Sequence, residues 1–240
     1  MSVIRDMIGL MGEARRMPEV TICLMADRTA DNDPFYAELL RQFHASATRR
    51  HPRCPVIRAF QFGVALCVMP ASFDDYFMAI EAAARRNYKK ALRNGFEFRS
   101  ISFNEHLAGI AEIRRSTPLR QGRLSKDFLE AEVVACKDPP SRTPFHTYPY
   151  YGVFKNGKLV AYSGCLVMGE AFLVEQIYGH ADYLADGVVP MLLIGMAADI
   201  YSRFPQVKYY GYGTYFGAGK TMRRFKKKFL FLPHRVEWEK

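Results

Sequence analysis

Apolar and polar residues recur with clear periods along the chain, and these periods predict an ordered series of strands and helices. Strand patterns cover residues 20–26, 55–69, 96–102, 150–154, 159–168, 171–179, 207–213 and 234–239. Helical patterns cover residues 35–48, 72–92, 104–115, 126–136, 190–203 and 217–229. Ser72, followed by Asp75 three residues on, predicts a helix N-cap. Asn156 and Gly157 predict a type I′ turn that joins two strands in a hairpin.

The second part of the chain follows a definite order: three antiparallel strands, a loop, a helix, a strand, a basic helix and a closing strand. The length of 240 residues, with 49% hydrophobic and 24% charged residues, is ordinary for a globular protein. We expect one domain over residues 1–240. Residues 1–147 form its helix-rich first part, which could be a reduced second half, and residues 148–240 form its core.

The charge balance favours polyanionic partners, because 34 Lys and Arg against 24 Asp and Glu give a net charge of +10. RNA, a nucleotide phosphate, an acidic membrane or a merely basic surface all remain open. The five cysteines show no metal-site spacing and no disulfide framework, which favours a reducing, cytoplasmic setting. Residues 1–17 lack a secretory apolar run, and the apolar stretch at 188–198 is shorter than the roughly 20 residues of a membrane span. We expect a soluble protein, of open oligomeric state.

The element order, with Tyr212-Gly213 ending a strand, Phe225-Lys226 in the next helix and Pro233 before the closing strand, resembles the GNAT acyltransferase superfamily. It looks most like the branch shared with Fem-type, aminoacyl-tRNA-dependent transferases. Residues 72–95 and 120–123 also resemble the first half of such proteins. The resemblance implies an α/β (α+β) fold with a mixed, mostly antiparallel central sheet flanked by helices. It also implies an N-acyltransferase that moves an acyl or aminoacyl group to an amine.

Two departures from the family pattern bear on the donor. The loop that holds the CoA pyrophosphate in GNAT enzymes matches only at Gly187, and Asp186 places a negative charge beside it. The glycine that usually follows the Phe-Lys helix is absent from residues 229–231. Aminoacyl-tRNA and acyl-CoA both remain candidate donors, and the imperfect loop and the net charge favour aminoacyl-tRNA. Residues 217–221 look like a phosphate-binding loop but lack its first glycine and its parallel sheet, so we reject a nucleotide triphosphatase.

Four residues are candidates for the chemistry of acyl transfer. Glu175 is the acid in its strand and can take the proton of the amine, or it is a solvent-facing glutamate. Lys226 is chosen from the resemblance alone, as support for developing negative charge, and otherwise belongs to a solvated helix face. Tyr212 can protonate the leaving group, or it is a packing residue. His180 can act as a base, or it caps the following loop.

Further candidates would bind substrates. The resemblance and the basic helix suggest donor-binding groups at Gly187, Val188, Val189, Arg223, Arg224 and Lys227. Arg120 and Arg123 can bind an anionic substrate, or they belong to a charged surface loop. The acceptor is a small-molecule or peptide amine, and no tightly bound cofactor or metal is implied. A non-catalytic RNA-binding module on a transferase scaffold is the alternative function.

Overall fold

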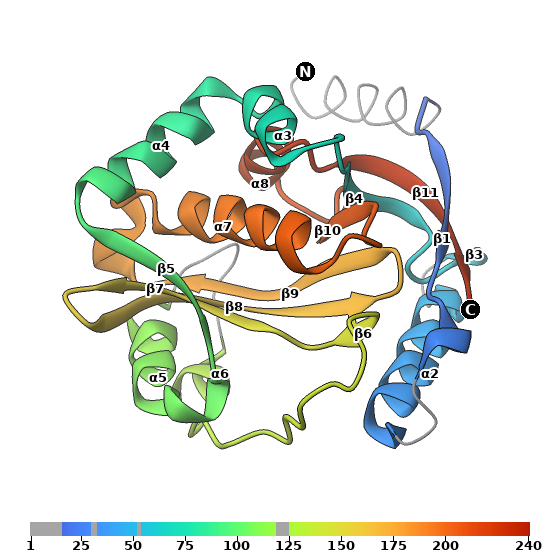
Figure 1. Cartoon of the computed structure of the whole chain (residues 1–240), viewed down its shortest axis with the longest axis horizontal. Helices are drawn as coiled ribbons and strands as arrows, with labels where there is room; N and C mark the ends of the chain where they lie inside the picture. Colours follow the sequence, from blue (N-terminus) through green and yellow to red (C-terminus); the bar gives the residue numbers. More distant parts are fainter. Residues whose placement is uncertain (1–15, 30–32, 52–53, 119–124) are drawn as a thin grey trace.

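A mixed sheet runs through the computed structural model, which describes residues 16–29, 33–51, 54–118 and 125–240 (Figure 1). Its strands lie in the order β1-β11-β4-β10-β9-β8-β7-β5, and β6 pairs with β8 outside this path. Their bounds are β1 Glu19–Cys23, β4 Phe62–Val68, β5 Phe96–Ile101, β6 His146–Thr147, β7 Tyr150–Lys155, β8 Lys158–Met168, β9 Ala171–Gly179, β10 Tyr209–Thr214 and β11 Leu232–Glu239. Strands β2 (Arg50–His51) and β3 (Cys54–Arg58) form a separate pair.

The described strands pair antiparallel, except that β1 runs parallel to β11 and β9 runs parallel to β10. This confirms the mixed, mostly antiparallel sheet expected from the sequence. Asn156 and Gly157 have φ angles of 50° and 78° between β7 and β8, as the predicted type I′ turn requires. Strand β4, from the first part of the chain, lies between β10 and β11 from the last part.

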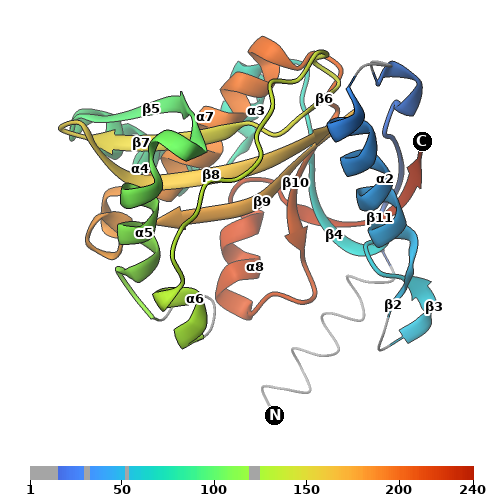
Figure 2. The same ribbon diagram turned by 90° about the horizontal axis from the view of Figure 1, so that it is seen from below.

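Helices cover both faces of the sheet (Figures 1 and 2). Their bounds are η1 Ala26–Arg28, α2 Pro34–Thr48, α3 Phe73–Ala79, α4 Ala82–Arg93, η2 Phe103–Glu105, α5 Leu107–Arg115, α6 Lys126–Glu130, η3 Ala181–Asp186, α7 Val188–Arg203 and α8 Lys220–Lys227. Helix α7 packs on β5, β7, β8 and β9, and α3 and α4 pack on α7. Helices α2 and α5 cover the opposite face. We call these two sides the α7 face and the α5 face.

The helix predicted over residues 72–92 is two helices. Ser72 does cap the first, since its hydroxyl accepts a hydrogen bond of 3.1 Å from the main-chain N–H of Asp75. Ile80 then adopts an extended conformation, and the guanidinium of Arg85 donates to the carbonyl groups at the end of α3. The main-chain N–H of Glu81 donates to the carbonyl of Lys228, beyond α8. Contacts with a distant part of the chain therefore set this break.

Because β4 pairs with both β10 and β11, we propose that the two parts of the chain unfold as one cooperative unit. Trp238 is the single tryptophan and is 6% exposed, with its ring stacked 5.7 Å from that of Phe60. Its fluorescence therefore reports on β11 and the residues packed against it. We expect urea unfolding curves from tryptophan fluorescence and from far-ultraviolet circular dichroism to coincide. Two separate transitions would mean that the first part of the chain unfolds independently.

Candidate functional site

Strands β9 and β10 start as parallel neighbours and then diverge. Their pairing covers Tyr209–Gly211 with Ala171–Leu173, although β9 continues to Gly179 and β10 to Thr214. Figure 2 shows the ends of the two strands pointing in different directions. Main-chain groups of β9 beyond Leu173 are therefore no longer paired with β10. Such groups are strong hydrogen-bonding partners for an inserted substrate.

Glu175 lies at a β-bulge just past this point. On β8, Gly164 pairs with Gln176 and Cys165 pairs with Val174, so Glu175 is the extra residue of β9. A bulge interrupts the alternation of side chains between the two faces of a sheet. Val174 packs in the core on the α7 face, whereas Glu175 and Gln176 both contact residues of the α5 face. Two successive polar side chains therefore lie on the α5 face beside the divergence.

Tyr148 holds the Glu175 carboxylate. Its hydroxyl donates a hydrogen bond of 2.9 Å to Oε2 of Glu175, from a position two strands away. The ring can cross β8 because Gly164 lies beneath it: a Cβ there would lie 3.1 Å from the Tyr148 ring and 2.9 Å from that of Tyr150. Burial, followed by the charge of Glu175, raises the pKa of Tyr148 above its ordinary value, so the phenol stays protonated. Tyr148 is not among the residues that the sequence pattern singles out, because its only local signal is its place before a strong strand.

Arg114 of α5 lies on the same face. Its Nε donates to the hydroxyl of Tyr162 at 2.9 Å, and one of its terminal nitrogens lies 3.5 Å from Oε1 of Gln176. Tyr162 is fully buried, so it fixes the guanidinium against the sheet. The sequence pattern did not single out Arg114, which resembles any cation in the last turn of a helix.

Lys226 occupies the α7 face at the end of β10. Its side chain is only 5% exposed, and Nζ donates to the main-chain carbonyls of Tyr212 at 2.5 Å and Thr214 at 2.8 Å. The ammonium also lies 4.7 Å from the centre of the Tyr212 ring. Burial lowers the pKa of Lys226 to about 8. Lys226 therefore differs from its exposed neighbour Lys227, a distinction that the run of basic residues in the sequence could not make.

Tyr212 packs beside Lys226, with its ring 5.7 Å from that of Phe231 and against the core of the α7 face. The structure therefore brings Tyr212 and Lys226 together on one side of the sheet, and places Glu175 on the other side. The divergence of β9 and β10 lies between them.

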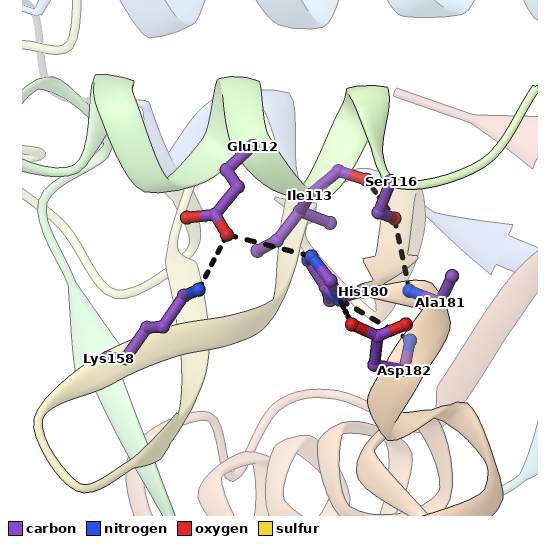
Figure 3. Close-up of polar contacts among 7 residues, drawn as sticks. All are labelled: Glu112, Ile113, Ser116, Lys158, His180, Ala181 and Asp182. Carbon is purple, nitrogen blue, oxygen red and sulfur yellow. Dashed lines mark hydrogen bonds and ion pairs between the residues drawn. The ribbon is translucent and has the colours of Figure 1, made fainter.

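His180 caps the loop after β9 (Figure 3). Its Nδ1 accepts a hydrogen bond of 3.4 Å from the main-chain N–H of Asp182, and Nε2 lies 3.7 Å from the carboxylate of Glu112. Glu112 accepts a hydrogen bond from Lys158, which lowers the pKa of Glu112. Ser116 accepts a hydrogen bond from the N–H that follows His180 in the chain. The observed contacts of His180 fasten α5 to the end of β9.

The N-terminus of α7 is covered by α4. Gly187 precedes α7 with φ of 86°, and a Cβ on it would lie 2.5 Å from the carbonyl oxygen of Asn87. Lys90 bonds to the carbonyl of Ala185 and pairs with Asp186 at 3.2 Å. The first helical residues, Val188 and Val189, are followed by Pro190, which has no N–H to offer a phosphate. This helix end is therefore crowded by α4 and carries an acidic neighbour.

The remaining candidate residues lie on α8 or outside the described part of the chain. Arg223 donates to the carbonyl of Ala218, and Arg224 lies 3.8 Å from Glu81. Lys227 is exposed, with Nζ 5.7 Å from the centre of the Tyr215 ring. These three cations lie on the helix that carries Lys226. Arg120 and Arg123 fall within residues 119–124, outside the described residues.

Two cavities lie away from the divergence. One, of about 540 Å³, lies between the end of α7 and the start of β10, and another, of about 210 Å³, lies along β1 and β11. Within residues 16–29, 33–51, 54–118 and 125–240, no group of three or more His, Cys, Asp or Glu could hold a metal ion. In the same ranges, no helix combines the length and apolar character that crossing a membrane requires.

We expect Lys226 to make stability depend on alkaline pH. Its pKa is about 8 in the folded state, against an ordinary value of 10.5, so between these values the unfolded chain binds the extra proton. The free energy of unfolding therefore rises with pH across this window, by about 3 kcal/mol relative to a Lys226→Met variant. Urea titrations of both proteins at about pH 7.5 and about pH 10 measure this difference.

Lys227→Met is the matched control for this experiment, because Lys227 is exposed on the same helix. This control should follow the wild-type pH dependence. An identical rise in Lys226→Met and wild type would contradict the assigned burial of the Lys226 charge.

Comparisons with known proteins bear on the fold. The sequence matches no family model and no curated protein. Among solved structures, the chain is similar to FemX, with a TM-score of 0.54 and 10% identity over 72% of this chain and 59% of that one. It is also similar to the C-terminal domain of a protein described as a lysylphosphatidylglycerol synthetase from Agrobacterium fabrum, with a TM-score of 0.46 and 16% identity over 72% and 58% of the two chains.

A third similar structure is a tandem GNAT protein from the clavulanic acid biosynthesis pathway, with a TM-score of 0.45 and 11% identity over 91% of this chain and 59% of that one. The chain thus spans less than three fifths of each of these three proteins. Identities this low bear on the fold alone. Together with the divergent pair of parallel strands, the similarity to FemX confirms that the fold is GNAT-like and of the Fem type.

Proposed function

We propose that this protein is an N-acyltransferase whose reaction takes place where β9 and β10 diverge. The observation that carries the proposal is the meeting of three features at this point: the end of the strand pairing, the bulge at Glu175, and the buried ammonium of Lys226. The Fem-type fold and the resemblance of the Phe225-Lys226 region to Fem-type transferases support the same reaction class.

The two substrates approach from opposite faces of the sheet. The acyl donor lies on the α7 face, where Lys226 and the cations of α8 are, and the acceptor amine lies on the α5 face beside Glu175. The reacting carbonyl enters the divergence between the two strands. This arrangement holds amine and carbonyl in line for attack, which by itself supplies a large part of the rate.

Each group then has a role set by its position. Glu175, held by Tyr148, takes the proton of the attacking amine. Main-chain N–H groups of β9 beyond its pairing with β10 stabilise the oxyanion of the tetrahedral intermediate. Lys226 supports the developing negative charge through its own positive charge, because its Nζ already donates hydrogen bonds to two main-chain carbonyls. Tyr212, on the donor side, protonates the leaving group.

The crowded N-terminus of α7 favours aminoacyl-tRNA over acyl-CoA as the donor. A CoA pyrophosphate binds at such a helix end through main-chain N–H groups and the helix dipole. Here Asn87 lies against Gly187, Pro190 removes one N–H, and Asp186 adds negative charge. The cations of α8, in contrast, suit an RNA backbone.

We expect charged tRNA, and not CoA, to raise the melting temperature of the protein. A donor that binds only the folded state stabilises it by about 2.7 kcal/mol at a concentration of about 100 times its Kd. Thermal unfolding with acetyl-CoA and with aminoacyl-tRNA, in separate samples, tests this. Stabilisation by CoA alone would reverse the choice of donor.

We expect Glu175→Gln to lower kcat for acyl transfer by about 100-fold or more, because the amide cannot accept the amine proton. The measurement is the rate of amide formation at saturating donor. Glu97→Gln is the matched control, since Glu97 is an exposed glutamate on β5, and it should keep wild-type activity.

The same variant separates catalysis from simple RNA binding. If wild-type protein binds tRNA in a steeply salt-dependent way, forms no amide with any amine, and binds tRNA unchanged after Glu175→Gln, then the protein is an RNA-binding module. Full activity of Glu175→Gln would instead remove Glu175 as the base.

A further inference from the structure

Helix α4 carries a stripe of cations on its exposed side. Its 12 residues include five Lys or Arg and no Asp or Glu. Ala84 and Ala91 are buried against the rest of the protein, whereas Arg86, Lys89 and Arg93 are exposed. Spacings of three, four and seven residues place these three cations on one side of the helix. We call Arg86, Lys89 and Arg93 the α4 stripe.

The other two cations of α4 have partners within the protein. Arg85 donates to the main-chain carbonyls at the end of α3, and Lys90 pairs with Asp186. Among the salt bridges that join described residues, none includes a member of the α4 stripe. Lys89 lies 6.0 Å from the centre of the Phe77 ring and is still exposed. The positive charge of the α4 stripe is therefore not balanced by an acid of the described chain.

Local structure does not explain the α4 stripe. Cations in the last turn of a helix are favoured by the helix dipole, which accounts for Lys90 and Arg93. Arg86 and Lys89 precede that turn. Like charges three or four residues apart on one helix face repel one another, so the α4 stripe destabilises the helix that carries it. A bound polyanion would remove this repulsion.

The start of α4 adjoins the end of α8, the helix that carries Lys226. The main-chain N–H of Glu81 donates to the carbonyl of Lys228, and Arg224 lies 3.8 Å from the carboxylate of Glu81. From there α4 runs along α7 towards β5 (Figure 1). A strand of phosphates that reaches the proposed donor side over α8 can therefore continue onto α4.

The length of the α4 stripe fits an extended polyanion better than a single phosphate. Arg86 and Arg93 are seven residues apart, which is about 10 Å along a helix. The charges of one nucleic-acid strand follow one another at about 3.4 Å along a duplex. Cations spread over this distance therefore meet several phosphates of one strand, whereas a small anion would meet only one or two of them.

We propose that the α4 stripe binds the phosphate backbone of the tRNA donor, away from the end that reacts. This inference rests on the proposed function, because it takes aminoacyl-tRNA as the donor and names the surface that holds the body of the tRNA. Contacts to phosphates position a nucleic acid without reading its base sequence. The α4 stripe therefore orients the donor, and the reacting end is left to the divergence of β9 and β10.

The test removes the three charges together, in the variant Arg86→Gln, Lys89→Gln, Arg93→Gln. Each lost phosphate contact reduces the salt dependence of binding, the slope of log Kd against log salt concentration, by about 0.7 to 0.9, so three reduce it by about 2 to 3. At about 0.1 M salt we expect the affinity for aminoacyl-tRNA to fall about 10-fold or more. Fluorescence anisotropy titrations over a range of salt concentrations measure both quantities.

A shortened donor separates a binding defect from a structural one. It carries the aminoacyl group on the terminal dinucleotide alone and lacks the body of the tRNA. In the triple variant we expect kcat/KM to fall about 10-fold with full-length aminoacyl-tRNA and by less than about 2-fold with the shortened donor. A variant that merely damaged the fold would lose activity with both donors.

Arg41→Gln, Arg49→Gln, Lys137→Gln is the matched control. It removes three exposed cations around α2, on the opposite face of the sheet, and should keep the wild-type affinity and salt dependence. Circular dichroism and melting temperature establish that both variants are folded. Loss of the like charges on α4 should leave the melting temperature unchanged or raise it.

Wild-type affinity and salt dependence in the folded α4 variant would overturn the inference and leave the transferase function standing. Binding of wild type to vesicles of anionic phospholipid that is lost in the α4 variant, with tRNA binding unchanged, would also overturn it and assign the α4 stripe to a membrane surface. Absence of tRNA binding by wild type at every salt concentration would instead count against aminoacyl-tRNA as the donor in the proposed function, and the inference would fall with it.

Discussion

The end of the pairing between β9 and β10 is the constraint on which the candidate site depends. Main-chain carbonyls at a buried strand end need hydrogen-bond donors. Where two strands separate, the carbonyls lose the donors of the neighbouring strand and would be costly to bury. Lys226 supplies these donors, because its ammonium donates hydrogen bonds to the carbonyls of Tyr212 and Thr214 from the next helix. The same lysine carries a positive charge into the α7 face of the divergence. One buried residue thus supplies donors to the carbonyls at the end of β10 and places an ammonium there.

The α5 face has the complementary character. The bulge places Glu175 and Gln176 on this side, and the missing side chain at Gly164 lets Tyr148 cross β8 to reach the carboxylate. A larger residue at that position would push the ring away. The sheet therefore separates a side with the ammonium of Lys226 from a side with the carboxylate of Glu175 and the guanidinium of Arg114. In the proposed reaction, this separation lets the two substrates meet without sharing a binding surface.

Helix α4 covers the N-terminus of α7. There the main-chain carbonyl of Asn87 lies against Gly187, and Lys90 pairs with Asp186. The charge of Lys90 balances an acidic residue of the protein itself. The positive charge of the chain is therefore carried mainly by other, exposed side chains, including those of α8.

The sequence by itself determined the local structure and the class of fold. Its periods and turn residues specified the hairpin at Asn156-Gly157 and the cap at Ser72, because these depend on neighbours in the chain. Resemblance to Fem-type proteins pointed to Lys226, and strand position pointed to Glu175. Only the tertiary structure decided that β4 lies between β10 and β11, that α4 covers Gly187, and that Tyr148 and Arg114 flank the site. These contacts join residues far apart in sequence, and the period of a segment fixes which side chains are buried without fixing what they meet.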